Sequence, residues 1–338
     1  MIVGRRRFIY GSAAGLSGLG GFGLQACTPS ADAPLRTVDI LPEGFPTVIG
    51  LEAMRDDLLE RSGGRLQMKI YPGAQLGAEK DTLELTVFGG LDIARVNIAP
   101  LNAFVPETRV PSLPFMFRSI DHMRVAMDGA PGQIILESMR SHGLVGLAFY
   151  DSGARSFYTS ERSINDPSDL SGLKIRVQNS DLFVSMIRAL GGNPTPIPLG
   201  EVYQGLLQGV IDGAENNWPS YESFRHFETA PYYSLTRHVI SPEVVCLSLK
   251  TWERLSEADR EMVQAAARVS VPIMRAAWDE RVETSKSIVS EAAKPVTVTE
   301  PPVAPFQEKV QAVWAQYLDS PRLQEITDMI QSIDETAS

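Results

Sequence analysis

The amino-acid sequence predicts an α/β fold built from two domains. Short runs of alternating apolar and polar residues, at residues 66–70 and 173–177, indicate strands. Each run precedes a segment with helical spacing that ends at a glycine pair, residues 89–90 and 191–192. Strands that alternate with helices are typical of α/β proteins with largely parallel sheets. At 338 residues, the chain is long enough for two such domains.

The expected elements fall into two blocks on either side of a turn-rich segment, residues 165–171. The first block holds strands at residues 37–41, 66–70, 91–97 and 144–150, a helix over residues 47–61 capped by Thr47, and a helix after Gly77. The second block holds a strand at residues 173–177, a helix capped by Ser180, a short helix near residues 202–207 and a strand that ends at Asn216.

A long helix is expected near the C-terminus. Ser256 and Asp259 have the spacing of a capping box, and an Ala-rich helical pattern runs from there to about residue 293. This length exceeds that of an ordinary globular helix, and Pro272 inside it should bend the helix.

The first 27 residues indicate an export signal and are left out of the fold. Residues 5–9 read RRRFI and fit a twin-arginine signal. Residues 24–27 read LQAC and resemble a lipobox, in which Cys27 would be acylated and become the new N-terminus. The alternative is an ordinary signal peptide cut near Ala26. The remaining cysteine, Cys246, lies in an apolar run and is expected to be buried.

Composition and motifs exclude several classes of function. The net charge of −10 argues against a nucleic-acid partner, which needs a basic face. The four histidines show no metal-ligand spacing, so neither a metal nor another cofactor is expected. No nucleophile elbow, P-loop or dinucleotide motif is present, so the chain is not expected to be an enzyme. After the signal, no stretch is apolar enough to span a membrane.

Two segments carry a resemblance to a known family. Residues 173–180 read LKIRVQNS, and residues 194–217 read PTPIPLGEVYQGLLQGVIDGAENN. In this order and at this separation, they resemble the core of the DctP-type periplasmic solute-binding proteins of TRAP transporters. A looser match extends from about Val38 to the C-terminus.

The resemblance implies a two-domain periplasmic binding protein fold with a hinge cleft and a long helix that spans both domains. Domain I is expected to comprise residues 36–152 and about 242–280, and domain II residues 153–241 and about 281–338. The implied partners are a small organic acid and the membrane permease subunits of a TRAP transporter. A periplasmic location, a lipid anchor at Cys27 where the lipobox interpretation holds, and a monomeric state are also expected.

Three residues are expected to hold a carboxylate. Arg176 and Asn216 lie near the ends of expected strands, where α/β sheets bind ligands, and a guanidinium can donate two parallel hydrogen bonds to a carboxylate. By resemblance, Arg176 matches the arginine that forms the salt bridge to the ligand, and Arg155 a second arginine in the same cleft. Asn216 matches the asparagine of the family's D-G-x-E-N motif, whereas Glu215 beside it is expected to be structural.

Four further residues in the first block are expected to contact the distal groups of the ligand. Arg95 and Asn97 lie two apart on one strand and therefore on one face. Asn97 replaces the glutamate that the resemblance implies for sialic-acid binders. Glu79 matches a position that meets ligand hydroxyls, and Glu43 lies in the first strand-end loop. The competing interpretation of each is an ordinary surface polar residue.

A sugar acid fits this set of residues. The strings ILPEGFPT, ARVNIAPL and FYDSGARSFY (residues 40–47, 94–101 and 149–158) resemble those of family members that bind hexuronates such as glucuronate or galacturonate. One alternative is a C4-dicarboxylate or another organic acid, for which Arg95 could supply a second cation. A periplasmic sugar-acid enzyme and a sensor that signals to a membrane kinase are alternatives of other classes.

Overall fold

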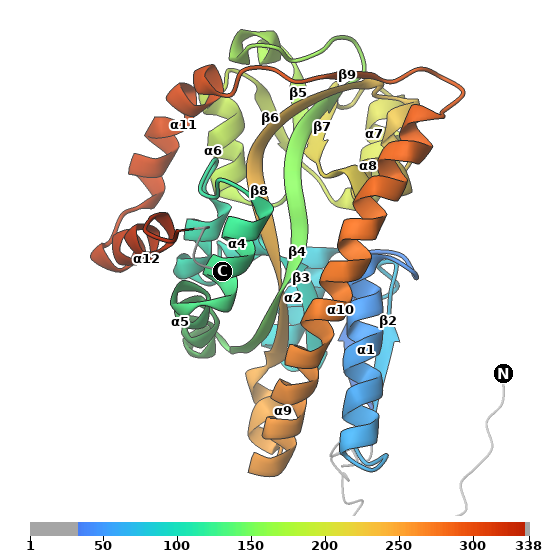
Figure 1. The fold of residues 1–338 in the computed structure, drawn as a ribbon, viewed down its shortest axis with the longest axis vertical. Coiled ribbons are helices and arrows are strands. Elements are labelled where there is room, and N and C mark those ends of the chain that lie inside the picture. The colour runs from blue at the N-terminus through green and yellow to red at the C-terminus, as the bar shows by residue number, and fades with distance from the viewer. Residues whose placement is uncertain (1–32, 335–338) are drawn as a thin grey trace, which may run out of the picture. The chain divides into compact units, whose positions relative to one another are not determined.

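The structure, a computed structural model, describes residues 33–334 (Figure 1). The twin-arginine motif and Cys27 therefore lie outside the described residues. The described strands form one mixed sheet in the order β2-β1-β3-β8-β4-β7-β5-β6, with β9 paired to β8. Their bounds are β1 Leu35–Val38, β2 Met68–Tyr71, β3 Ile93–Asn97, β4 Leu144–Thr159, β5 Lys174–Val177, β6 Asn193–Pro196, β7 Gly213–Asn216, β8 Tyr232–Ser248 and β9 Thr297–Thr299.

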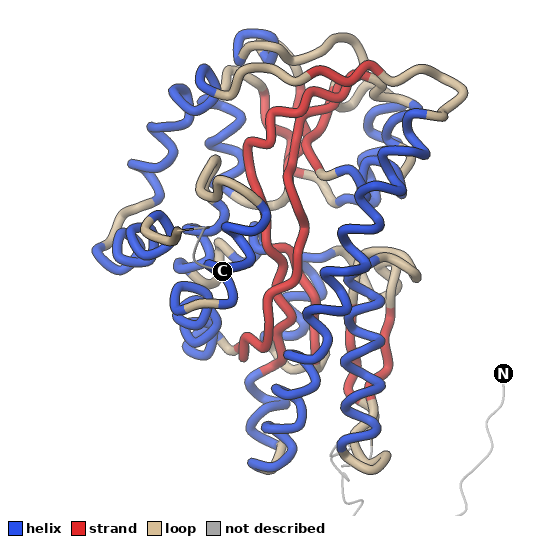
Figure 2. The backbone as a smooth tube through the Cα atoms, in the orientation of Figure 1, coloured by secondary structure: helices blue, strands red, loops and turns tan. Residues whose placement is uncertain are grey.

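Two long strands, β4 and β8, run through the whole sheet (Figure 2). They pair with each other in antiparallel fashion from one end to the other. The C-terminal part of β8 pairs with β3, while the C-terminal part of β4 pairs with β7. The sheet therefore has two sections that share β4 and β8, which matches the predicted two-domain α/β fold.

The expectation of largely parallel sheets is wrong at the centre of the structure. The outer pairs are parallel: these are β1–β2, β1–β3, β5–β6 and β5–β7. The pairs β3–β8, β8–β4 and β4–β7 are antiparallel. One strand that crosses between two sections must be followed by another that returns, and neighbours that run in opposite directions pair as antiparallel strands.

Strand β4 is much longer than the predicted segment, residues 144–150. Nearly all of its side chains are buried, so the alternation of apolar and polar residues that marks a half-buried strand is lost. Gly153 breaks the regular register between Asp151 and Ala154, with φ +65°. A Cβ atom at Gly153 would lie 3.0 Å from the Trp278 ring, so a glycine fits this crossing point.

The helices cover both sections of the sheet. The α-helices are α1 Pro46–Arg61, α2 Glu79–Val87, α3 Ile98–Leu101, α4 Ile120–Asp128, α5 Ala130–Ser138, α6 Asp181–Ala189, α7 Val202–Leu207, α8 Trp218–Ser223, α9 Leu249–Arg254, α10 Glu257–Ser290, α11 Ala304–Tyr317 and α12 Pro321–Gln331. The 3₁₀ helices are η1 Pro106–Ser112, η2 Met139–His142, η3 Pro167–Leu170, η4 Leu199–Glu201 and η5 His226–Glu228. None of the described helices combines the length and the apolar character that crossing a membrane requires.

The long helix α10 contacts both sections, as Figure 1 shows. It packs along α1 and β4 and reaches α8, which follows β7. It begins where predicted, because the Ser256 side chain accepts a hydrogen bond from the Asp259 N–H. It ends at Ser290, near the predicted end. At the C-terminus, α11 packs on α6 whereas α12 packs on η1 and α5.

The predicted cap of one helix is wrong, and that of another lies at the predicted position without its side-chain bond. Helix α1 begins at Pro46 after Phe45, and the Thr47 hydroxyl donates instead to Asp39 Oδ2 at 2.8 Å. Ser180 precedes α6 but makes no capping bond, and its hydroxyl pairs with the Asn102 side chain. In both cases a buried polar partner elsewhere takes up the hydroxyl.

Cys246 is buried, as expected.

Gly50 allows the close approach of α1 to α10 and β4. A Cβ atom there would lie 2.8 Å from Met274 Cβ and 2.9 Å from the Tyr150 ring. Gly50→Ala should therefore lower the free energy of unfolding by about 1–3 kcal/mol, despite the better helix propensity of alanine. Urea denaturation measures the change. Gly200→Ala, where nothing lies within 4 Å of the added Cβ, is the control and should shift stability by less than about 0.5 kcal/mol.

Candidate functional site

A cavity of about 520 Å³ lies where residues from both sections of the sheet meet. Its lining includes residues of β3 from one section, β5 and β7 from the other, and the shared strands β4 and β8. Six of the seven predicted binding residues line it: Arg176, Arg155, Asn216, Arg95, Asn97 and Glu79. The fold thus brings together residues that lie up to 137 positions apart, between Glu79 and Asn216.

Glu43 is placed differently. Its side chain is exposed and does not belong to the cavity lining, whereas its neighbours Leu41, Pro42 and Phe45 do. A contact between Glu43 and a ligand stays a prediction that this arrangement does not favour.

Arg176 is a buried cation without a carboxylate partner among the described residues. It lies on β5 with 3% of its surface exposed, and its Nε donates to the Ile197 carbonyl at 2.9 Å. Its Nη1 is buried and has no hydrogen-bond partner. Burial lowers the pKa of Arg176 from its ordinary value, since the charged form loses its hydration. A buried, unpaired donor in a cavity favours an anionic ligand.

The positive charge of Arg155, by contrast, is compensated by a carboxylate. Its Nε and Nη2 form a fork on the Glu215 carboxylate, at 2.5 and 2.8 Å. Nη2 also donates to the Glu215 carbonyl at 2.8 Å, and Nη1 donates to Asn216 Oδ1 at 2.9 Å. Burial alone would raise the pKa of Glu215, but Arg155 and His238 together outweigh burial and lower it. Four of the five N–H groups of Arg155 are thus occupied, and the fifth, on Nη1, remains for a ligand.

Asn216 lies at the end of β7 and has a fixed orientation. Its Oδ1 accepts hydrogen bonds from Arg155 Nη1 and from the Asn217 N–H, both at 2.9 Å. Its Nδ2 has no acceptor within the described part of the chain, so this amide donor is available at the cavity wall. Asn217 in turn caps α8 and donates to the Ser152 carbonyl on β4.

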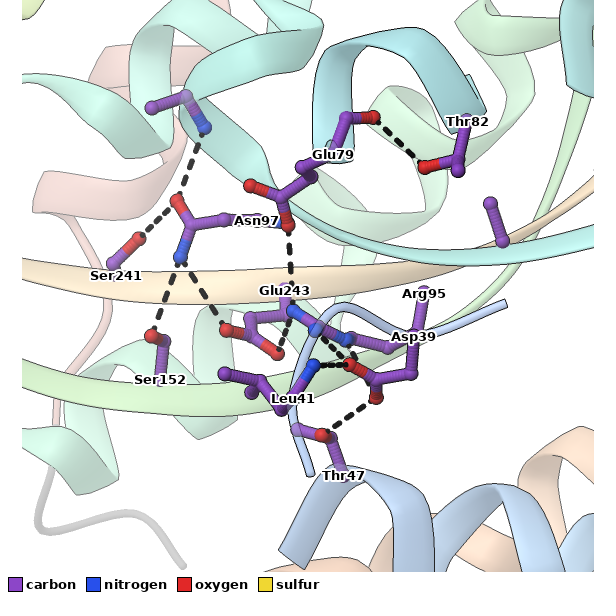
Figure 3. Close-up of polar contacts among 12 residues, drawn as sticks. Asp39, Leu41, Thr47, Glu79, Thr82, Arg95, Asn97, Ser152, Ser241 and Glu243 are labelled. Carbon is purple, nitrogen blue, oxygen red and sulfur yellow. Dashed lines mark hydrogen bonds and ion pairs between the residues drawn. The ribbon is translucent and has the colours of Figure 1, made fainter. Parts of the chain in front are cut away.

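The other side of the cavity contains three carboxyl groups around one guanidinium (Figure 3). We call Asp39, Glu79 and Glu243 the acidic cluster. Arg95 donates to Asp39 through Nε at 2.9 Å and through Nη2. Its Nη1 donates to Glu243 at 2.9 Å and reaches Glu79 at 3.5 Å. Four of the N–H groups of Arg95 therefore already bind carboxylates.

The pKa values of this group reflect burial and the excess of acids. Burial raises the pKa of Glu243 to about 7, although Arg95 opposes the rise. Burial also raises the pKa of Glu79, against the charge of Arg95. Burial alone would lower the pKa of Arg95, but the charges of Asp39 and Glu243 outweigh it and raise this pKa. Arg95 therefore stays charged.

Asn97 has most of its hydrogen-bonding capacity occupied. Its Oδ1 caps α3 by accepting from the Ala99 N–H at 3.2 Å and also accepts from the Ser241 hydroxyl at 3.2 Å. Its Nδ2 donates to Ser152 at 3.2 Å and lies 3.5 Å from Glu243. In this arrangement Asn97 ties β3 to β4 and β8, and its contact with a ligand stays a prediction.

Sequence reasoning missed Asp39 and Glu243. Asp39 directly follows β1, and Glu243 interrupts the apolar run of β8 opposite Asn97. A charged residue inside an apolar strand was the available signal, because such a residue is buried only with a partner. The partner itself, Arg95, becomes visible only through the pairing of β3 with β8.

Comparisons with known proteins identify the family of the chain. The family model described as bacterial extracellular solute-binding protein, family 7 (DctP) matches residues 37–320. A solute-binding protein from Chromohalobacter salexigens is 42% identical over 305 residues, with 90% of each chain covered. A TRAP periplasmic solute-binding protein from Bradyrhizobium sp. BTAi1, solved in complex with α/β-D-galacturonate, is 47% identical, with a TM-score of 0.87 and coverage of 89% of this chain and 100% of that one. One from Chromohalobacter salexigens with bound D-glucuronate is 42% identical, with a TM-score of 0.84 and coverage of 88% and 98%.

The raised pKa of Glu243 predicts a pH-dependent loss of stability. A carboxyl group whose pKa rises from 4.5 to about 7 on folding stabilises the protein fully below pH 4.5, and this contribution is lost as the pH rises through 7. Glu243→Gln should therefore gain about 1–3 kcal/mol of unfolding free energy over wild type on going from pH 5 to pH 8. Urea denaturation at both pH values measures this gain.

Glu228→Gln is the matched control. The hydrogen bond from Arg225 lowers the pKa of Glu228 in the folded state, so its contribution to stability is lost only below pH 4.5. Its stability difference from wild type should be the same at pH 5 and pH 8. An equal difference at the two pH values for Glu243→Gln would show that Glu243 does not titrate in this range.

Proposed function

Since the chain belongs to the bacterial extracellular solute-binding protein family 7, the DctP solute-binding proteins of TRAP transporters, we propose that it captures a hexuronate such as glucuronate or galacturonate and delivers it to a TRAP membrane permease. The membership confirms the resemblance carried by residues 173–180 and 194–217. The hexuronate is supported by the solved relatives with bound galacturonate and glucuronate at 42–47% identity.

The observation that carries the proposal is the guanidinium of Arg176 in the cavity, which has no carboxylate partner among the described residues. Its buried Nη1 needs an acceptor, and a carboxylate supplies both the acceptor and the compensating charge. The remaining N–H of Arg155 and the Nδ2 of Asn216 are additional donors for the same carboxylate. A ligand with one carboxylate therefore satisfies all three.

The opposite wall offers acceptors instead. Glu79 and Glu243 are carboxyl groups, and carboxylates accept hydrogen bonds from sugar hydroxyls. We propose that Glu79 contacts the hydroxyls at the end of the sugar that lies away from the carboxylate. Arg95 and Asn97 would then act mainly by holding the acidic side chains in place. Their direct contacts with the ligand would use the N–H groups that do not already bind protein acceptors.

A C4-dicarboxylate is the weaker alternative. It requires a second cation for its second carboxylate, and Arg95 was the candidate. Four of the N–H groups of Arg95 bind Asp39, Glu79 and Glu243. The family consists of transport proteins that bind solutes, and we propose that the ligand leaves the cavity chemically unchanged, as expected for a protein without catalytic activity.

Ligand capture is proposed to involve closure of two domains about β4, β8 and α10. We assign residues 36–152 and about 242–280 to domain I and residues 153–241 and about 281–338 to domain II. This assignment is supported by the two sections of the sheet that share β4 and β8. Because Arg176 and Glu79 come from different sections, only the closed form can satisfy contacts from both.

We propose that the chain is exported to the periplasm by the twin-arginine motif and anchored by a lipid at Cys27, and that it acts as a monomer. Mass spectrometry of the mature protein should find diacylglycerol on Cys27 at the N-terminus, because the LQAC string has the lipobox pattern. Cys27→Ser should yield no lipidated N-terminus. An unmodified N-terminus in the wild-type protein would remove the anchor from the proposal.

Arg176 is predicted to dominate binding. Arg176→Ala should weaken hexuronate binding by at least about 2 kcal/mol, or roughly 30-fold, because the buried carboxylate loses its partner. Arg176→Lys should also weaken binding, since an ammonium group cannot reproduce the two parallel hydrogen bonds of a guanidinium. Isothermal titration calorimetry with glucuronate and galacturonate measures both effects.

The matched control is Arg188→Ala, which removes an exposed arginine from α6 and should leave affinity unchanged. Unchanged affinity in folded Arg176→Ala protein would falsify the assignment of the carboxylate to Arg176. Wild-type protein that binds no hexuronate would overturn the proposed ligand.

A further inference from the structure

We propose that the acidic cluster makes the cavity selective for sugar acids with a single carboxylate, with Glu79 and Glu243 as the residues that exclude a second one. The inference rests on the proposed function and adds a specificity that this function does not contain. The excluded ligands are the six-carbon aldarates, sugar acids that carry a carboxylate at both ends.

The two ends of the cavity carry opposite charge. Arg176 lies on β5, whereas Arg95 lies on β3, and the order β3-β8-β4-β7-β5 places them on opposite sides of the shared strands. Both line the same cavity. A ligand that binds Arg176 through one end therefore directs its other end toward the acidic cluster.

The acidic cluster has more negative charge than Arg95 can neutralise. It contains three carboxyl groups, whose side chains are 0%, 12% and 4% exposed for Asp39, Glu79 and Glu243, against one guanidinium. If one of these groups carries a proton, as the raised pKa of Glu243 favours, the net charge of the four side chains is still negative. This wall therefore repels a carboxylate, and the low-dielectric surroundings strengthen the repulsion.

The cluster nevertheless suits a hydroxyl group. Glu79 Oε1 accepts from the Asn97 N–H at 2.9 Å and is near Arg95 Nη1, while Oε2 has no hydrogen bond from the described residues (Figure 3). Glu79 lines the cavity, so Oε2 is an acceptor available to a ligand. A sugar hydroxyl can donate to it, whereas a carboxylate has no proton to donate.

Lys80 does not change this balance. It also lines the cavity, but its side chain is exposed and its Nζ lies 4.0 Å from Glu84. Its charge is screened by water and belongs to the rim, whereas the acidic cluster is buried.

The test compares three ligands on the wild-type protein at pH 8 by isothermal titration calorimetry. The ligands are galacturonate, galactonate and galactarate. Galactonate and galactarate share an open six-carbon chain and differ only in whether the second end is a hydroxymethyl group or a carboxylate. We expect galactarate to bind at least about 100-fold more weakly than galacturonate, and more weakly than galactonate, because like charges meet in the buried cluster.

The variants assign this selectivity to residues. Glu79→Gln and Glu243→Gln each remove one negative charge while keeping the side-chain shape. Each should reduce the preference for galacturonate over galactarate by about 10-fold or more. Asp81→Asn, an exposed acid on the same helix as Glu79, changes the net charge equally and should leave the preference unchanged. A cooperative thermal unfolding transition without ligand verifies that each variant is folded.

The outcomes separate this inference from the proposed function. If the wild-type protein binds galacturonate and galactarate equally, the proposed exclusion of a second carboxylate is wrong and the hexuronate proposal still stands. An unchanged preference in both glutamine variants also overturns it, as does equal exclusion of galactonate and galactarate, because shape then accounts for the selectivity. If the wild-type protein binds no sugar acid, both the proposed function and the proposed exclusion of a second carboxylate are wrong.

Discussion

The pairing of β4 with β8 is the constraint on which the rest of the structure depends. These two strands belong to both sections of the sheet, so they connect the cavity residues of one section with those of the other. Arg155 lies on β4 and Glu243 on β8. The side chain of each contacts a cavity residue on a neighbouring strand. The binding cavity is thus organised around the backbone ladder that connects the sections.

The three arginines of the cavity differ in their partners and therefore in their roles. Arg95 faces three carboxyl groups, Arg155 faces one, and Arg176 faces none among the described residues. All three are nearly fully buried, so their cost of desolvation is similar. The carboxylate partners offset this cost for the first two, and a ligand must offset it for the third. Arginine count alone therefore overstates the number of anion sites.

Much of the fold and part of the site could be predicted from the sequence. The alternation around Arg176, the strand that ends at Asn216 and the Ser256 cap of α10 are local patterns, and local patterns are visible in a sequence. The full length of β4 and the whole of β8 were not predicted in this way, because strands buried on both faces lose their alternation. The Thr47 cap failed because Asp39, eight residues away, competes for the same hydroxyl.

The electrostatic state of the site is the part that sequence could not supply. Arg95 and Glu243 are separated by 148 residues, and Arg155 and Glu215 by 60. Whether an arginine is neutralised depends on such long-range pairs, which arise only from strand register. The family motif identified residues that line the cavity, but the motif does not state which of them is unpaired.

The fork between Arg155 and Glu215 has a consequence for the thermodynamics of capture. Both side chains are held by several hydrogen bonds before any ligand arrives, so their rotational freedom is already lost when the protein folds. Immobilising a flexible side chain at a binding interface costs about 0.5–1.5 kcal/mol. For Arg155 this entropic cost is borne by the folding free energy, and the ligand meets a wall that is already ordered.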